Sequence, residues 1–202
     1  MKKFFLVAIL AILCTAQVGC VAAPKTQALF SPQDNIADKL IEWIDKEEEC
    51  IQTAVYCLTH RGIVQALVNA KKRSVAVEVI VDPFSLKGKA LLPLVEAGIP
   101  LYVWNPEASN QGKGKKIPLM HDKFCLLGQK RLWTGSFNFT YEASRANKEN
   151  VIVMENGSLV TKYRHEFEAI KVNCLPYQKY VALFPQKIPP KKGDLAIISS
   201  HN

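Results

Sequence analysis

The sequence predicts an α/β fold, an α/β/α sandwich built on a mixed, mainly parallel sheet. Between residues 32 and 104, segments with helical spacing of apolar residues alternate with short runs rich in β-branched residues. Such alternation is the pattern of a sheet that helices cover on both faces. The run 75–81 is almost continuously apolar, as expected of a central parallel strand that is buried on both sides.

The elements of the first half follow one another without long gaps. Pro32 and Asp34 mark the start of a helix, because proline and capping residues favour a first helical turn. A strand, a second helix, the central strand, a third helix and a third strand come next, at residues 51–56, 63–73, 75–81, 89–97 and 101–104.

The second half predicts a β-hairpin and a closing helix. Two apolar strands, 121–127 and 131–134, are joined by the short polar turn 128–130. A further strand follows at 151–154, and apolar residues at helical spacing continue from 159 to 170.

Three segments describe the domain organisation. Residues 28–174 form one domain, which is large enough to bury a core of its own. Residues 175–202 are rich in proline and lysine and lack periodicity, so we expect a tail outside the core. Residues 1–23 are a signal peptide or a membrane anchor, since Lys2 and Lys3 precede a long apolar stretch.

The fate of this leader stays open. Val18-Gly19-Cys20 resembles a lipoprotein cleavage site, with lipidation at Cys20, and Cys14-Thr15-Ala16 resembles an ordinary cleavage site. The stretch 4–23 also has about the 20 apolar residues that an uncleaved anchor needs. We therefore expect a protein that is exported to the periplasm or medium, or anchored in a membrane.

Charge and cysteine content limit the partners. A composition of 49% hydrophobic and 22% charged residues is typical of a globular protein, and a net charge of +8 favours anionic partners such as nucleic acid or acidic lipid. The same charge could serve solubility alone. The spacing of the cysteines in the domain fits no common zinc site, and they are either disulfide-bonded or buried free thiols. These cysteines are Cys50, Cys57, Cys125 and Cys174.

Five polar residues near the hairpin carry the chemistry. His121 and Lys123 are two apart in an extended strand, so their side chains share a face. Ser136 and Asn138 share a face in the same way after the second strand, and Glu149 precedes the next strand. The hairpin therefore brings imidazole, ammonium, hydroxyl and amide groups together.

This set of groups suits displacement at the phosphorus of a phosphodiester. A neutral imidazole at His121 can attack phosphorus and form a covalent intermediate. The groups of Lys123, Ser136 and Asn138 can donate to the non-bridging oxygens, and Glu149 can hold the second ring nitrogen of His121. No carboxylate cluster is needed for this chemistry, so we expect neither a metal nor another cofactor.

The residues that carry this chemistry resemble a known motif. The stretch 121–138 resembles the phospholipase D superfamily motif H-x-K-x4-D-x6-G-S-x-N, with Gly128 in place of the family aspartate. It is most similar to the single-motif members, the bacterial endonucleases and the mitochondrial cardiolipin hydrolases. The resemblance covers about residues 30–171. It implies a phospholipase D-like catalytic domain.

The resemblance also implies that two copies of the motif meet at one site. A two-fold homodimer would supply both copies from one sequence. His121 of one subunit would attack, and His121 of the other would protonate the leaving oxygen. Before the catalytic strand, a glycine-containing loop carries three further candidates for binding substrate phosphates, although such a loop could also be a solvated turn. These candidates are Lys113, Lys115 and Lys116.

Three functions remain open from the sequence. The first is a metal-independent endonuclease acting on DNA or RNA, which the basic charge and the lysine loop favour. The second is a phospholipase D acting on phosphatidylcholine or cardiolipin to give phosphatidic acid, which an N-terminal membrane anchor would favour. The third is a non-catalytic protein that binds nucleic acid or lipid, and Gly128 is the feature that favours it.

Overall fold

The computed structural model describes residues 25–105 and 118–185. Within these ranges the strands are β1 (Thr26–Phe30), β2 (Cys50–Val55), β3 (Ala76–Val81), β4 (Leu101–Trp104), β5 (Lys123–Leu127), β6 (Arg131–Gly135), β7 (Asn150–Glu155) and β8 (Cys174–Pro176). The helices are α1 (Ile36–Lys46), α2 (Arg61–Lys72), the short 3₁₀ helix η1 (Pro83–Lys87), α3 (Leu92–Glu96), α4 (Tyr141–Arg145), α5 (Gly157–Val172) and α6 (Tyr177–Leu183). The predicted third helix, 89–97, is thus shorter than expected.

All eight strands belong to one mixed sheet, in the order β1-β7-β6-β5-β2-β3-β4-β8. The predicted mixed α/β sheet is confirmed, but its description as mainly parallel is wrong. Only β2–β3 and β3–β4 pair in parallel, whereas the other five pairings of the described strands are antiparallel. A tight turn such as 128–130 can join only antiparallel strands, since parallel neighbours need a long crossover.

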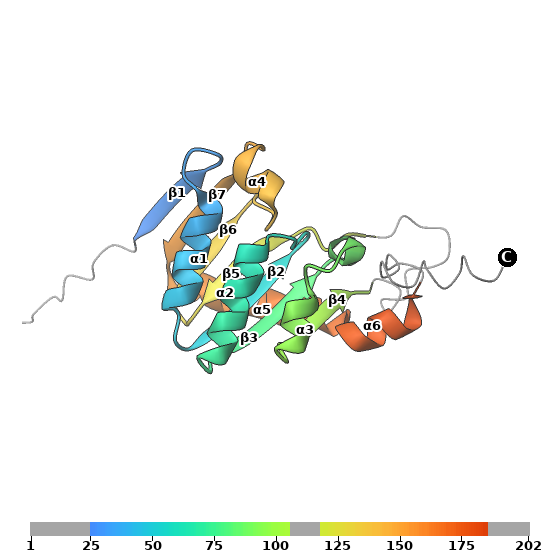
Figure 1. Ribbon diagram of the computed structural model, residues 1–202. Coiled ribbons are helices and arrows are strands. Elements are labelled where there is room, and N and C mark those ends of the chain that lie inside the picture. Colours follow the sequence, from blue (N-terminus) through green and yellow to red (C-terminus); the bar gives the residue numbers. More distant parts are fainter. Residues whose placement is uncertain (1–24, 106–117, 186–202) are drawn as a thin grey trace, which may run out of the picture.

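Helices cover both faces of the sheet, which confirms the sandwich (Figure 1). Under α1, α2 and α3, apolar side chains such as Leu40, Leu67 and Val79 form the larger core cluster. On the opposite face, α5 packs Phe167 against Phe124 and other residues of the sheet. Alternate residues of each strand therefore serve two cores, as the two-residue repeat of a strand requires.

The boundary predicted at residue 175 is wrong, because the chain re-enters the fold there. Leu175 in β8 pairs with Val103 in β4, and Tyr180 in α6 is a buried core residue. A three-residue strand and a seven-residue helix are too short to show periodicity in the sequence. The predictions for residues 1–23 and for the last part of the tail fall on residues outside the described ranges. Across the described ranges, no helix has both the length and the hydropathy needed to cross a bilayer.

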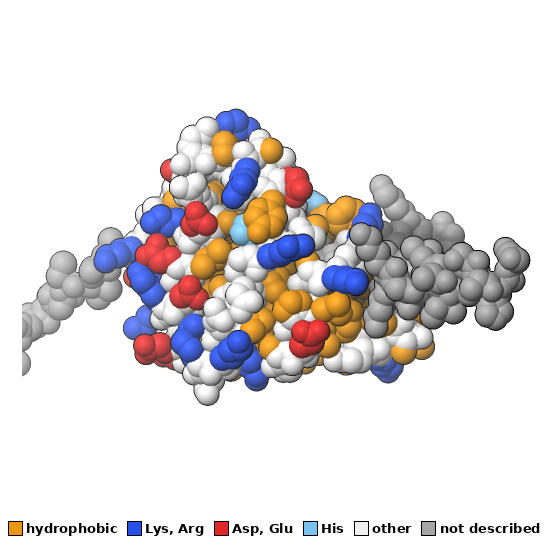
Figure 2. Space-filling model, viewed as in Figure 1, with side chains coloured by type: hydrophobic (Ala, Val, Ile, Leu, Met, Phe, Trp, Pro, Cys, Tyr) orange, Lys and Arg blue, Asp and Glu red, His pale blue; other side chains and the backbone are white. Residues whose placement is uncertain are grey.

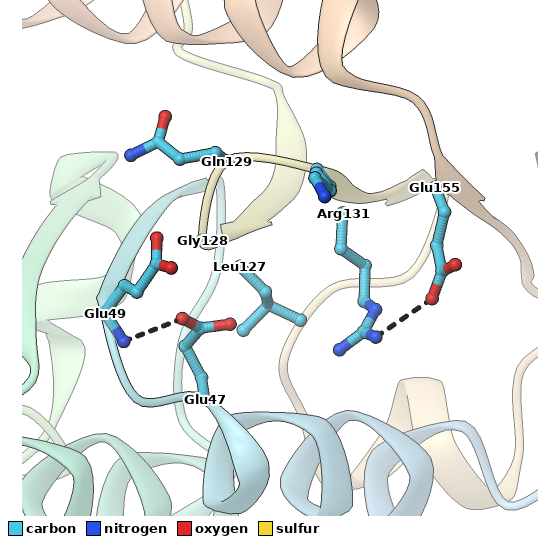
Figure 3. A pocket seen from close by; sticks show the side chains of 8 residues that line it. Glu47, Glu49, Leu127, Gly128, Gln129, Arg131 and Glu155 are labelled. Atoms are coloured by element: carbon cyan, nitrogen blue, oxygen red, sulfur yellow. Dashed lines mark hydrogen bonds and ion pairs between the residues drawn. The ribbon is translucent and has the colours of Figure 1, made fainter.

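Gly128, which replaces the family aspartate, lies in the β5–β6 turn. Since β5 starts beside the predicted site at Lys123 and ends at Leu127, this turn is at the far end of the strand. Gly128 has a φ of 59°, and a Cβ there would lie 3.1 Å from a carboxylate oxygen of Glu47. Figure 3 shows the Glu47 side chain pointing at the turn, in a pocket that is also lined by Arg131 and Glu155. The buried Glu47 thus places a carboxylate beside the position of the missing aspartate.

Restoring the aspartate with Gly128→Asp is expected to destabilise the protein. The left-handed backbone disfavours a side chain, and a second carboxylate would stand beside Glu47. We expect a loss of about 1–3 kcal/mol in the free energy of unfolding, measured as a lower Tm. Adding Glu47→Gln should recover part of the loss, because it removes the like charge. An unchanged Tm in Gly128→Asp would contradict this account of the turn.

Candidate active site

The functional side chains gather at one edge of the sheet. Strands β2, β3 and β6 end at this edge, and Tyr56, Asp82 and Ser136 directly follow them. Strands β5 and β7 run in the opposite direction, so they begin at the same edge, next to His121 and Glu149. Antiparallel pairing therefore brings together residues that precede some strands and follow others.

His121 and Lys123 form the centre of the site. The His121 side chain is exposed, whereas Lys123 is buried with 8% of its surface accessible. The Lys123 ammonium lies 3.1 Å from His121 Nδ1 and donates to the main-chain oxygen of His121 at 2.5 Å. Burial lowers the pKa of Lys123, and the negative charges of Asp122 and Glu149 act in the opposite direction. A buried cation beside an exposed imidazole is an arrangement that can hold an anion at the ring.

Ser136 and Glu149 form a second contact at the same edge. Ser136 Oγ donates to Glu149 Oε2 at 2.6 Å and accepts from the main-chain N–H of Asn150 at 3.0 Å. Glu149 was expected to hold a ring nitrogen of His121, but no hydrogen bond joins these two residues in the described part of the chain. Its other carboxylate oxygen accepts from Asn147 at 3.1 Å. Glu149 therefore fixes the Ser136 hydroxyl in this structure.

The structure gives separate roles to the glycine and the asparagine of the motif, Gly135 and Asn138. A Cβ at Gly135 would lie 2.0 Å from the main-chain oxygen of Asn150, so strand β7 leaves no room for a side chain there. Asn138 Oδ1 is buried, and no partner for it occurs within residues 25–105 and 118–185. A buried acceptor without a partner is costly unless a ligand or a water donates to it, which makes Asn138 a candidate ligand contact.

Several residues that the sequence did not single out hold the site in place. The buried Asp82 accepts from the main-chain N–H of Met120 at 3.1 Å, directly before His121. Burial raises the pKa of Asp82, although the main-chain N–H groups of Phe84 and Met120 favour its charged form. Ser31 Oγ accepts from the N–H of Glu149 at 3.1 Å and so ties β1 to the site. Asp82-Pro83 at the end of an apolar strand was the available signal for Asp82, whereas nothing local marks Ser31.

Two further expectations concern the lysine loop and the cysteines. Lys113, Lys115 and Lys116, the candidate phosphate clamp, lie outside the described residues. Cys125 shares strand parity with Lys123 but is fully buried in the core, and burial raises the pKa of its thiol. The four cysteines of the described domain are free thiols, so the disulfide alternative is wrong for the pairs they could form among themselves.

Comparison with known proteins assigns the family. A family model described as "Cardiolipin synthase, PLD-like domain" matches residues 40–171, which is more than half of the chain and includes every residue of the motif. The chain belongs to the phospholipase D superfamily. The resemblance stated from the motif is thereby confirmed, and the superfamily is one of phosphodiesterases.

Curated relatives and solved structures agree with this assignment. A "Phospholipase D" of Rickettsia conorii is 33% identical over 142 residues, covering 69% of this chain and 66% of its own. A "Mitochondrial cardiolipin hydrolase" of Xenopus laevis is 27% identical over 149 residues, covering 73% and 63%. The chain thus spans about two thirds of the length of these relatives.

Among solved structures, a phospholipase D family member named Nuc, from Salmonella typhimurium, is similar to this chain with a TM-score of 0.66. It is 28% identical, and the match covers 77% of this chain and 99% of that one. NucT from Helicobacter pylori gives a TM-score of 0.68 at 20% identity, covering 77% of this chain and 100% of that one. At that identity the likeness to NucT shows the fold alone.

Proposed function

We propose that this superfamily member is a metal-independent endonuclease that hydrolyses DNA or RNA through a covalent phosphohistidine at His121. The observation that carries the proposal is the buried Lys123 ammonium 3.1 Å from Nδ1 of the exposed His121 imidazole. Ser136 and Asn138 lie at the same edge of the sheet. His121 supplies a nucleophile, and the Lys123 ammonium and the side-chain N–H groups of Asn138 supply donors for the non-bridging oxygens of a phosphodiester. Ser136 can join them once its hydroxyl leaves Glu149.

Lys123 links phosphate binding to activation of the nucleophile. An ammonium can only donate, so Nδ1 accepts from it and the proton of a neutral His121 sits on Nε2. When a phosphate arrives, the ammonium turns to a non-bridging oxygen and releases Nδ1, and solvent water takes the ring proton from Nε2 and returns one to Nδ1. Nε2 then carries the free lone pair of the ring. It forms the bond to phosphorus while the bond to the leaving oxygen breaks.

A second histidine must protonate the leaving oxygen. In the described part of the chain His60 is buried and accepts from the N–H of Ile63, which caps α2, while His165 lies on α5. A homodimer with the site on its two-fold axis would supply the second His121 as this acid. Water then attacks the phosphohistidine, and the acid, now a base, takes the proton of the water. Export or membrane anchoring through residues 1–23 is part of the same proposal.

The choice of nucleic acid is tested with a substrate panel. The full chain is incubated in EDTA with single- and double-stranded DNA, RNA, phosphatidylcholine and cardiolipin, and His121→Ala serves as the control. We expect cleavage of nucleic acid that the variant lacks. Release of phosphatidic acid without cleavage of nucleic acid would contradict the nuclease assignment.

A phospholipase D is the second candidate. Curated relatives carry the names phospholipase D and mitochondrial cardiolipin hydrolase, and Leu119, two residues before His121, is 57% exposed. An exposed apolar side chain beside the nucleophile suits contact with a lipid surface. The third candidate, a non-catalytic binding protein, rested on Gly128, which lies at the opposite end of β5 from His121.

The alkaline limb of the pH profile is expected to reflect loss of the proton from Lys123. Burial lowers its pKa below the ordinary value of 10.5, so it loses its proton at a lower pH than an exposed lysine does. Because Lys123 can hold the phosphate only in its protonated form, kcat/KM of the free enzyme should fall as pH rises through this lowered pKa. Lys123→Arg, weaker overall, should lack this limb because a guanidinium stays protonated. An identical limb in both proteins would exclude Lys123 as its source.

A further inference from the structure

We propose that Tyr56, Phe84 and Lys87 form a subsite that binds one base of a single-stranded nucleic acid next to the scissile phosphate. This inference rests on the nuclease function proposed above and names the form of its substrate. The motif does not include these residues, which come from the segments that follow β2 and β3.

Three rings form a column that begins at the nucleophile. The ring centroids of His121 and Tyr56 are 4.6 Å apart with their planes tilted by 52°, and those of Tyr56 and Phe84 are 5.1 Å apart. Tyr56 and Phe84 are stacked with an interplanar angle of 17°. Phe84 is 41% exposed, so the outer end of the column is partly open to solvent. A flat ligand that stacks on Phe84 would therefore lie two rings away from the imidazole.

Buried polar contacts fix this column relative to His121. The Asp82 carboxylate accepts from the N–H of Phe84 at 2.9 Å and from the N–H of Met120 at 3.1 Å. One side chain thus holds both the main chain of Phe84 and the segment that carries the nucleophile. Ser85 Oγ donates to the main-chain oxygen of Tyr56 at 3.0 Å. An exposed aromatic ring on a main chain anchored in this way suits ligand binding better than it suits core packing.

One cationic side chain lies against the outer ring of the column, and two more line a cavity next to the segment that follows it. Lys87 Nζ lies 3.7 Å from the centroid of the Phe84 ring. The next residues, Gly88 and Lys89, line a cavity of about 530 Å³ together with Arg61 of α2. On the face covered by α1, α2 and α3, Figure 2 shows Lys and Arg side chains next to exposed hydrophobic ones. Aromatic platforms within a basic surface are the means by which proteins bind single-stranded nucleic acid.

The chemistry of the subsite favours a base over other ligands. A base can take the face of Phe84 while the Lys87 ammonium moves to a phosphate, since stacking of a base is stronger than one exposed cation–π contact. A choline headgroup is a cation and would be repelled by Lys87. A base in a duplex must leave its stack to reach the ring, which is costly. The preferred substrate is therefore single-stranded.

The test compares Phe84→Leu and Phe84→Trp in the full chain. Leucine keeps the apolar character of the side chain but removes the ring, and tryptophan keeps a ring for stacking. The substrates are a single-stranded oligonucleotide and the same oligonucleotide with abasic sites around the cleaved bond. Leu183→Ala, which truncates an exposed apolar side chain on α6, is the control.

For Phe84→Leu we expect KM for the intact oligonucleotide to rise about tenfold, with little change in kcat. Phe84→Trp should match the wild type, and on the abasic substrate all variants should be alike. If Phe84→Leu equals the wild type on the intact oligonucleotide, or if it loses activity equally on both substrates, the subsite is wrong and the nuclease function stands. If the wild type cleaves only lipid in anionic vesicles, the nuclease function and the subsite both fail.

Discussion

Replacing His121 by alanine is expected to lower turnover by about four orders of magnitude or more, as removal of a nucleophile does in other hydrolases. The reason is that His121 serves twice, as the atom that bonds to phosphorus and, in the second subunit, as the acid for the leaving oxygen. Its side chain is exposed, so the substitution leaves the core intact and Tm should not change. Initial rates on a fluorescent oligonucleotide measure the loss.

His165→Ala is the matched control. It removes another exposed imidazole, from the surface of α5, which covers the face of the sheet opposite α1, α2 and α3. This variant should keep the wild-type rate. Substantial activity in His121→Ala, or an equal loss in both variants, would refute the assignment of the nucleophile.

The second large effect concerns the dimer. Wild-type and His121→Ala chains, unfolded together and refolded, are expected to show activity that falls with the square of the wild-type fraction. A dimer with one intact His121 lacks either the nucleophile or the acid, so only wild-type pairs turn over. In an equal mixture about one quarter of the activity should remain.

A site completed within one chain gives a different result. Activity would then fall in proportion to the wild-type fraction, and the equal mixture would keep about half. Mixtures with His165→Ala should keep the full activity at every ratio, which controls for damage during refolding. A linear dependence would therefore rule out the shared site.

Much of the fold and the centre of the site could be predicted from local patterns. His121 and Lys123 lie side by side as the two-residue repeat predicts, although β5 begins only at Lys123, and the short turn after Leu127 folds the hairpin. The central strand β3 is parallel to both neighbours, as its continuous apolar run indicates. These features depend on residues that are close in the sequence.

The rest depends on contacts between distant segments. Ser31 reaches Glu149 across 118 residues, and Asp82 reaches Met120 across 38. No local pattern marks such pairs, and the same holds for β8, which joins β4 through three residues. The sequence assigns Glu149 to His121, whereas the position of β7 beside β6 places the Glu149 carboxylate against Ser136.

Stereochemistry at phosphorus tests the covalent mechanism most directly. The substrate is an oligonucleotide with one phosphorothioate of known configuration at the cleaved bond, hydrolysed in ¹⁸O-labelled water. Attack by His121 and then by water inverts phosphorus twice, so we predict net retention of configuration. Net inversion would show a single direct displacement by water and would contradict the phosphohistidine.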